Sequence, residues 1–288
     1  MTRFVALAAL VSVLLGASSA SAYCLASTCD AEGAVCFPPQ PTDCGRNLRW
    51  FRACVGYAVQ TDASVQVDRA TTRSALRAAF DSWEQASCGA GTPGIHVEDL
   101  KPVECDKVEY NENAGNVNLV VFRDLVWSHP DEPNHIALTT VTFDTESGEI
   151  LDADMEVNTA QHDLITPTAA GQYELLAVLT HEVGHFLGVA HSPLSEATMF
   201  ASYSVDSSSL APDDAQAICS IYPPTSGEVT CNPIPRHGFS ASCAGDQTEG
   251  DCSAAPPGST GKNGLSAIAA LLLGAALQRL RRGSRANA

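Results

Sequence analysis

An uninterrupted stretch at residues 181–191, with the sequence HEVGHFLGVAH, constrains this 288-residue chain more than any other feature. On a helix, residues i and i+4 lie on the same face, so His181 and His185 can direct two imidazoles toward one point. Glycine readily adopts the left-handed conformation that ends many helices, and Gly188 can therefore turn the chain so that His191 returns to that point. Three protein ligands with one open position are typical of a catalytic zinc site. The sequence thus predicts a helix, a sharp turn and one metal ion.

Glu182 follows the first of these histidines, where its carboxylate can reach a water molecule beside the metal. A structural metal site needs no such carboxylate, whereas hydrolysis needs a base that accepts a proton from water. The competing interpretation is an ordinary helix with two buried histidines and a surface glutamate. That interpretation gives no reason for His191, and we therefore favour a catalytic site with Glu182 as its general base.

The first 22 residues have the pattern of a secretory signal. Arg3 provides the positive start, an apolar run covers residues 4–15, and Ala20-Ser21-Ala22 is a small-residue cleavage site. The apolar run is short for a membrane span, which disfavours the competing interpretation of an uncleaved anchor. We therefore expect an exported protein whose mature chain begins at Tyr23.

The C-terminus carries a second apolar run at residues 265–277, followed by an arginine cluster at residues 279–285. With Cys252 and a spacer of small residues before it, this layout resembles the C-terminal sorting tails of myxobacterial surface proteins. A plain single-span anchor is the competing interpretation. Both predict an extracellular or cell-surface protein, with membrane association through residues 265–288.

The formal net charge of −17 disfavours nucleic acid and anionic lipid as partners. Eleven cysteines in an exported chain predict disulfides, and their odd number leaves one unpaired. We expect a disulfide-stapled N-terminal segment, and Cys88 and Cys105 are candidates to close a loop after the first helix. The stapled segment would contain Cys24, Cys29, Cys36 and Cys44.

Between the two ends, hydrophobic patterning predicts one main domain at residues 47–223. A Cys-rich segment at residues 23–46 precedes it, and a linker rich in Cys, Gly, Pro and Ser follows at residues 224–264. The first helix is expected at residues 67–87, capped by Thr71 or Thr72. The other expected elements are strands at 48–59, 116–122, 136–143 and 150–157, the metal-binding helix at 172–187, and a last helix that begins near Pro212.

With these features in place, the chain resembles the metzincin metalloproteases and, among them, the matrixins. The resemblance rests on the 181–191 motif, the serine at position 192, the sequence ATMFASY at 197–203 and the sequence LAPDD at 210–214. It implies an α+β, zincin-like domain with a twisted mixed sheet, about three helices and a zinc cleft. It also implies a methionine turn at Met199 beneath the metal, supported by Tyr203.

The resemblance implies a zinc-dependent endopeptidase that acts on proteins or peptides, and we expect it to be a monomer. One catalytic Zn²⁺ would polarise the scissile carbonyl and activate water. The substrate would bind extended along an exposed strand edge. By resemblance, that edge strand lies at residues 151–158, and residues 200–203 form the wall of the pocket for the side chain after the scissile bond.

Some matrixin features are missing from this sequence. A second, structural zinc would need further histidines after His129-Pro130-Asp131, but Thr139-Thr140 and Asp152-Ala153-Asp154 stand in their places, and we therefore expect none. Carboxylates suit calcium, although solvated surface positions are the simpler interpretation. The carboxylates concerned are Asp144, Glu146, Asp152, Asp154 and Glu156.

Two alternatives stay open at this point. Cys44, followed by Gly45, faintly matches the inhibitory cysteine of animal matrixins, but a disulfide is the expected fate of Cys44 in an oxidising compartment. The whole domain can also be interpreted as a catalytically silent binding or adhesion module that keeps zinc as a structural staple. Glu182 favours the enzyme, because a staple does not require that carboxylate.

Overall fold

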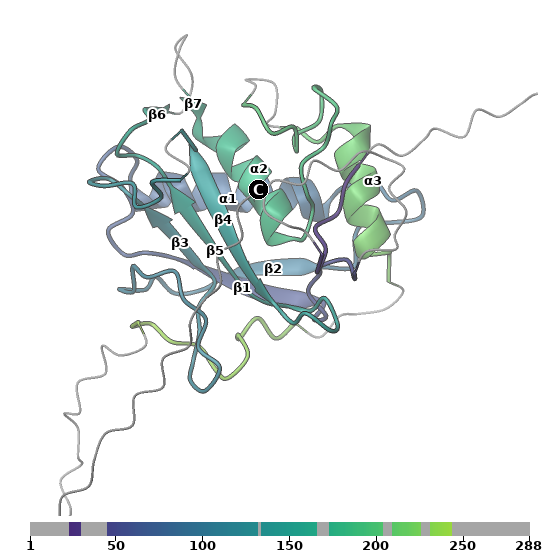
Figure 1. Ribbon diagram of the computed structural model, residues 1–288, viewed down its shortest axis with the longest axis horizontal. Coiled ribbons are helices and arrows are strands. Elements are labelled where there is room, and N and C mark those ends of the chain that lie inside the picture. Colours follow the sequence, from purple (N-terminus) through teal and green to yellow (C-terminus); the bar gives the residue numbers. More distant parts are fainter. Residues whose placement is uncertain are drawn as a thin grey trace, which may run out of the picture. The chain divides into compact units, whose positions relative to one another are not determined.

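The computed structural model (Figure 1) describes residues 23–29, 45–131, 134–165, 173–203, 209–225 and 231–243. All of them belong to one compact unit. Its centre is a five-stranded sheet in the order β2-β1-β3-β5-β4, in which only β4 runs antiparallel to its neighbour. The strands are β1 (Cys54–Val59), β2 (His96–Asp99), β3 (Leu119–Phe122), β4 (Ala137–Phe143) and β5 (Ile150–Val157). The predicted mixed α+β sheet is therefore confirmed.

β4 is one of the two outermost strands of the sheet. The resemblance implied that the edge strand beside the cleft lies at residues 151–158, and the structure contradicts this. β5 is paired with β3 on one side and with β4 on the other, so it has no free edge. A tight turn, in which the Gly148 N–H donates to the Asp144 carbonyl, folds β4 back against β5. Both strands alternate in sequence, and alternation alone cannot tell which of two paired strands lies outermost.

Three helices in the described part of the chain accompany the sheet: α1 (Arg69–Glu84), α2 (Leu175–Phe186) and α3 (Pro212–Ile221). The expected cap of α1 at Thr71 or Thr72 is wrong. The Asp68 carboxylate caps it by accepting from the N–H groups of Ala70 and Thr71, while Thr72 is buried. An ionised carboxylate is a stronger acceptor than a hydroxyl, which favours the earlier position.

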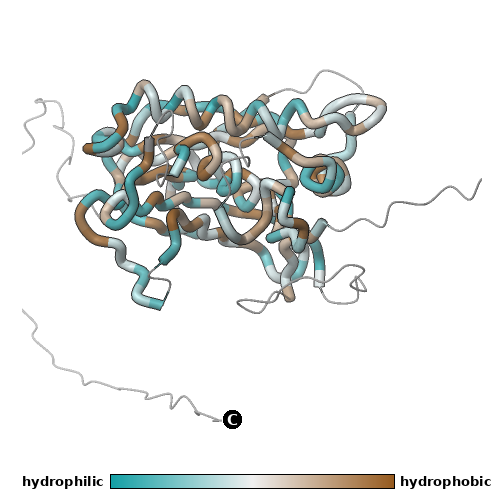
Figure 2. The backbone as a smooth tube through the Cα atoms, turned by 90° about the horizontal axis from the view of Figure 1, so that it is seen from above, coloured by the Kyte–Doolittle hydropathy of each residue, from teal (hydrophilic) through white to brown (hydrophobic). Residues whose placement is uncertain are grey.

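A large apolar core joins α1 and α2 to one face of the sheet. Phe80 of α1 stacks on Tyr57 of β1 at 4.7 Å between ring centroids and meets Phe186 of α2 edge-on at 5.2 Å. The Trp83 indole N–H donates to the Thr180 carbonyl, which fixes α1 against α2. Hydrophobic and hydrophilic stretches alternate along the tube in Figure 2, as expected of helices with one buried face. Near the start of α2, Leu164–Ile165 (β6) and Tyr173–Glu174 (β7) form a short parallel pair.

Residues 231–243, here called the C-terminal strap, lie against the opposite face of the sheet. Composition predicts a linker for 224–264, but disulfides from Cys231 to Cys54 and from Cys243 to Cys105 tie the strap to the domain. Phe239 packs on a second, smaller apolar cluster there. A segment rich in Gly, Pro and Ser is therefore held in place by covalent links that composition cannot reveal.

The disulfides differ from the expected loop closure between Cys88 and Cys105. Cys88 pairs with Cys219 on α3 instead, across 131 residues of sequence. Cys24 and Cys29 are also disulfide-bonded, in agreement with a stapled N-terminal segment. Cys36 and Cys44 lie outside the described residues, as do the expected signal and C-terminal tail. No helix within the described ranges is both long and apolar enough to cross a membrane.

Candidate active site

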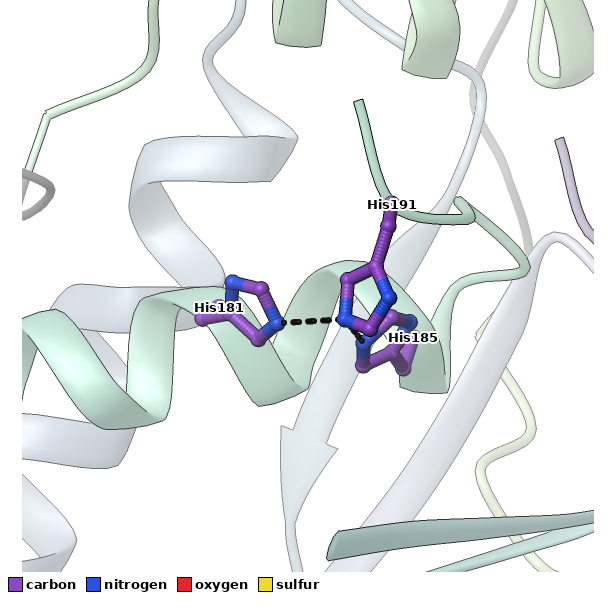
Figure 3. A group of neighbouring side chains, drawn as sticks. All are labelled: His181, His185 and His191. Atoms are coloured by element: carbon purple, nitrogen blue, oxygen red, sulfur yellow. Dashed lines mark hydrogen bonds between the residues drawn. The ribbon is translucent and has the colours of Figure 1, made fainter. Parts of the chain in front are cut away.

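The three histidines of the 181–191 motif converge on one point (Figure 3). The Nε2 atom of His191 lies 3.2 Å from Nε2 of His181 and 3.1 Å from Nε2 of His185. Tetrahedral zinc with Zn–N bonds of about 2.0–2.1 Å would hold such nitrogens about 3.3 Å apart. The spacing of the three donor atoms therefore fits a single tetrahedral metal ion.

The Nδ1 atoms of His181 and His185 explain why the Nε2 atoms of these two residues face inward. Nδ1 of His181 lies 2.8 Å from the Thr198 carbonyl, and Nδ1 of His185 lies 2.9 Å from the Val189 carbonyl. A carbonyl can only accept, so each Nδ1 carries the proton and donates it. This tautomer leaves the Nε2 lone pairs free for a metal, as in metal sites whose ligands are oriented by outer partners.

Electrostatics favour the neutral imidazoles of His185 and His191. Burial, followed by repulsion from His181 and His191, lowers the pKa of His185 well below its usual value. Desolvation and repulsion from His181 lower the pKa of His191 to about 4, although part of its surface faces solvent. Neutral imidazole is the form that binds a metal, and three imidazole donors suit zinc better than magnesium or calcium.

Gly188 makes the turn that returns the third histidine. Its φ is +92°, in the left-handed region, as the sequence predicts. A Cβ at this position would lie 2.3 Å from the carbonyl oxygen of Leu48, so the site has no room for a side chain. The N-terminal segment holds the same turn, because Ala26 N–H donates to the Gly188 carbonyl and Ala190 N–H donates to the Cys24 carbonyl.

Met199 lies beneath the motif and is fully buried. The segment around it is fixed by Asp214 in the first turn of α3, whose carboxylate accepts from the N–H groups of Thr198, Met199 and Ala211. The neighbouring Asp213 accepts from the Ser192 hydroxyl at 2.7 Å, next to the third histidine. The sequence LAPDD supported only the resemblance, but these two carboxylates tie α3 to both loops of the site.

Glu182 lies beside the histidines, with only 6% of its surface exposed. Burial is the largest influence on its carboxyl and raises the pKa, while His181 and a hydrogen bond from Thr139 act in the opposite direction. The Thr139 hydroxyl donates to Oε2 of Glu182 at 2.6 Å. Sequence reasoning noted Thr139 only as a missing zinc ligand and missed this contact, because the two residues come from different elements.

A cleft of about 680 Å³ opens over the histidines. β4 forms one side, α2 forms the floor, and residues 198 and 200–203 form the opposite wall. The Tyr203 hydroxyl accepts from the Glu174 N–H at 2.8 Å, and its ring lies 4.8 Å from that of Tyr173. Tyr203 therefore braces the wall against the start of α2.

The acidic residues considered for calcium fall into two groups. Asp144 accepts hydrogen bonds within its own turn, including one from the Ser147 hydroxyl. Asp152, Asp154 and Glu156 are buried on the far face of β5, so the expectation of solvated positions is wrong for them. Asp154 accepts from two backbone N–H groups, and Glu156 contacts His129 at 2.7 Å and Arg123 at 2.5 Å. Alternation along a strand cannot distinguish a solvated face from one covered by a loop.

Comparison with known proteins agrees with the geometry. A family model described as matrixin, within peptidase family M10, matches residues 49–223. No curated protein matches the chain. The matched region is more than half of the chain and contains the sheet, the three described helices and the histidine motif. The chain therefore belongs to the matrixin family, as the resemblance implied.

Proposed function

We propose that this protein is a zinc-dependent endopeptidase. Its membership of the matrixin family supports metalloprotease activity. The convergent Nε2 atoms of His181, His185 and His191 support a metal-binding site. These three residues would hold one zinc ion. Bound there, zinc would supply a Lewis acid that polarises the scissile carbonyl and lowers the pKa of a neighbouring water.

Glu182 would act as the general base and then as the general acid. It accepts a proton from the attacking water and passes it to the leaving amine, so that no covalent enzyme intermediate is needed. Burial raises the pKa of its carboxyl above that of a solvated glutamate. A base whose pKa lies nearer the working pH can both accept and return a proton.

The substrate would bind as an extended strand along β4. One edge of β4 pairs with β5, and residues 137–139 and 141 line the cleft. Main-chain hydrogen bonds to a strand edge provide affinity that tolerates many sequences, in keeping with protein and peptide substrates.

The disulfides are consistent with an extracellular protein. We further propose that residues 1–22 direct export, that the C-terminal tail associates with the membrane and that the protein is a monomer. Calcium binding stays a prediction.

The alternative is a surface binding module that uses zinc only as a staple. The position of Glu182 favours the enzyme, because its carboxylate lines the cleft beside the histidines instead of pairing with a cation elsewhere. A zinc staple gives no reason for a carboxylate at that place.

Two substitutions distinguish these functions. Glu182→Ala should remove cleavage of an unfolded protein such as casein while the purified protein keeps its zinc. His191→Ala should lose zinc during dialysis, measured by atomic emission. Equal cleavage by Glu182→Ala and the wild type would disprove the mechanism, and absence of cleavage in the zinc-loaded wild type would favour the binding module.

A further inference from the structure

We infer that Thr139 is a positioning residue that holds the Glu182 carboxylate in place for proton transfer. This inference rests on the proposed function. The Thr139 Oγ1 atom lies 2.6 Å from Oε2 of Glu182, within the range of a hydroxyl-to-carboxylate hydrogen bond. The carbonyl oxygen of Glu182 is farther from the same hydroxyl, at 3.3 Å. A hydroxyl has one proton to donate, and the shorter, charge-assisted contact takes it.

Thr139 is held in place by the pairing of β4 with β5. It lies opposite Met155 in the antiparallel register of β4 and β5, and Met155 is fully buried in the main core. Side chains alternate along a strand, so Thr139 points toward α2 while its neighbour Thr140 is exposed. A β-branched side chain has few rotamers, which keeps the hydroxyl directed at one place.

The geometry leaves Oε1 of Glu182 available to accept a proton from water. Within the described part of the chain, Thr139 is the hydrogen-bond partner found for the Glu182 carboxylate, and it engages Oε2 alone. Oε1 can then face a water in the cleft, which Glu182 lines. Proton transfer depends on a fixed donor–acceptor geometry, so a hydroxyl that stops the carboxylate from rotating contributes to turnover.

The role differs from zinc binding and from substrate binding. The Thr139 hydroxyl contacts Glu182. His181 and His185 are instead oriented by the carbonyls of Thr198 and Val189. Loss of the hydroxyl should therefore lower kcat without changing zinc content or KM. Thr140 provides a matched control, since it has the same side chain on the same strand but does not line the cleft.

The experiment compares four zinc-loaded mature proteins: wild type, Thr139→Val, Thr139→Ser and Thr140→Val. Thr139→Val keeps the branched shape and should lower kcat about tenfold or more, as expected for a lost hydrogen bond to a charged group. KM should stay within about twofold of wild type for both Thr139 variants, because ground-state binding is not altered. Thr139→Ser should restore most of kcat, and Thr140→Val should match the wild type.

Equal kcat in Thr139→Val and wild type, or equal losses in Thr139→Val and Thr139→Ser, would overturn the inference. Crystal structures of the wild type and Thr139→Val give a readout that does not depend on activity. The Glu182 carboxylate should remain bonded to Thr139 in the wild type and leave that position in the variant. An unmoved carboxylate contradicts the role of Thr139, whereas an inactive wild type contradicts only the proposed function.

Discussion

Gly184 and Met199 are in direct contact beneath the three histidines. A Cβ built on Gly184 would lie 2.2 Å from Sδ of Met199 and 2.8 Å from the Trp83 ring. Gly184 lies on α2 between His181 and His185, so the methionine packs against the helix segment that carries two of the three candidate ligands. Only glycine permits this approach, and the contact links the turn at Met199 to the geometry of the site.

Gly184→Ala tests this contact. Alanine favours a helix over glycine by about 1 kcal/mol. The overlap with a fully buried methionine should outweigh that gain, because overpacking a core costs about 1–3 kcal/mol. We expect a lower midpoint of thermal unfolding and reduced zinc content after dialysis. In the Met199→Ala background, Gly184→Ala should destabilise the protein less than it does in the wild type. Additive changes in the free energy of unfolding in this double-mutant cycle would refute direct contact.

The motif at residues 181–191 could be predicted because its geometry is local. Helical spacing brings His181 and His185 together, and the left-handed preference of glycine returns His191. The contact between Thr139 and Glu182 spans 43 residues, and the disulfide from Cys88 to Cys219 spans 131. Such contacts depend on how strands and helices pack, which sequence periodicity does not encode. The resemblance to matrixins also placed the edge strand at residues 151–158, whereas β5 is paired on both sides.

Ala26→Pro tests the role of the N-terminal segment at the metal site. Proline lacks the N–H that donates to the Gly188 carbonyl at 3.0 Å. We expect the free energy of unfolding to fall by about 1–3 kcal/mol, the cost of leaving a buried partner unsatisfied, and zinc to dissociate faster. Ala26→Ser keeps the N–H and is the control. Zinc release that is equally slow in both variants would show that the segment does not hold the His191 turn.

Asp214→Asn tests the connection between α3 and Met199. The Asp214 carboxylate accepts from three backbone N–H groups, whereas an amide would place its own N–H₂ against one or more of these donors. We expect a loss of about 2–4 kcal/mol in the free energy of unfolding, measured by chemical denaturation. Asp81→Asn weakens a partly exposed ion pair with Arg77 and should cost less than about 1 kcal/mol. Similar losses in the two variants would argue against a special role for Asp214.

The buried pair Asp152 and Asp154 predicts an unusual pH dependence of stability. Burial, followed by repulsion from Asp154, raises the pKa of Asp152, and burial also raises the pKa of Asp154. Because Asp154 accepts two backbone N–H groups while Oδ1 of Asp152 has no partner, Asp152 should hold the shared proton and donate it to Asp154. The folded state thus keeps a proton that the unfolded chain releases near pH 4. This contribution is fully present at low pH and is lost as the pH rises toward the raised pKa.

Asp152→Asn removes that proton linkage, since the amide is neutral and can donate to Asp154 at every pH. Relative to wild type, the variant should have nearly the same free energy of unfolding at pH 4 and be more stable at pH 8 by more than about 1 kcal/mol. Urea denaturation at several pH values measures the difference, in which the pH dependence of groups that do not interact with Asp152 cancels. Asp154→Asn should destabilise the protein across the whole range, because it disrupts the acceptor of the Leu119 and Glu109 N–H groups. A difference between wild type and Asp152→Asn that stays constant with pH would contradict the shared proton.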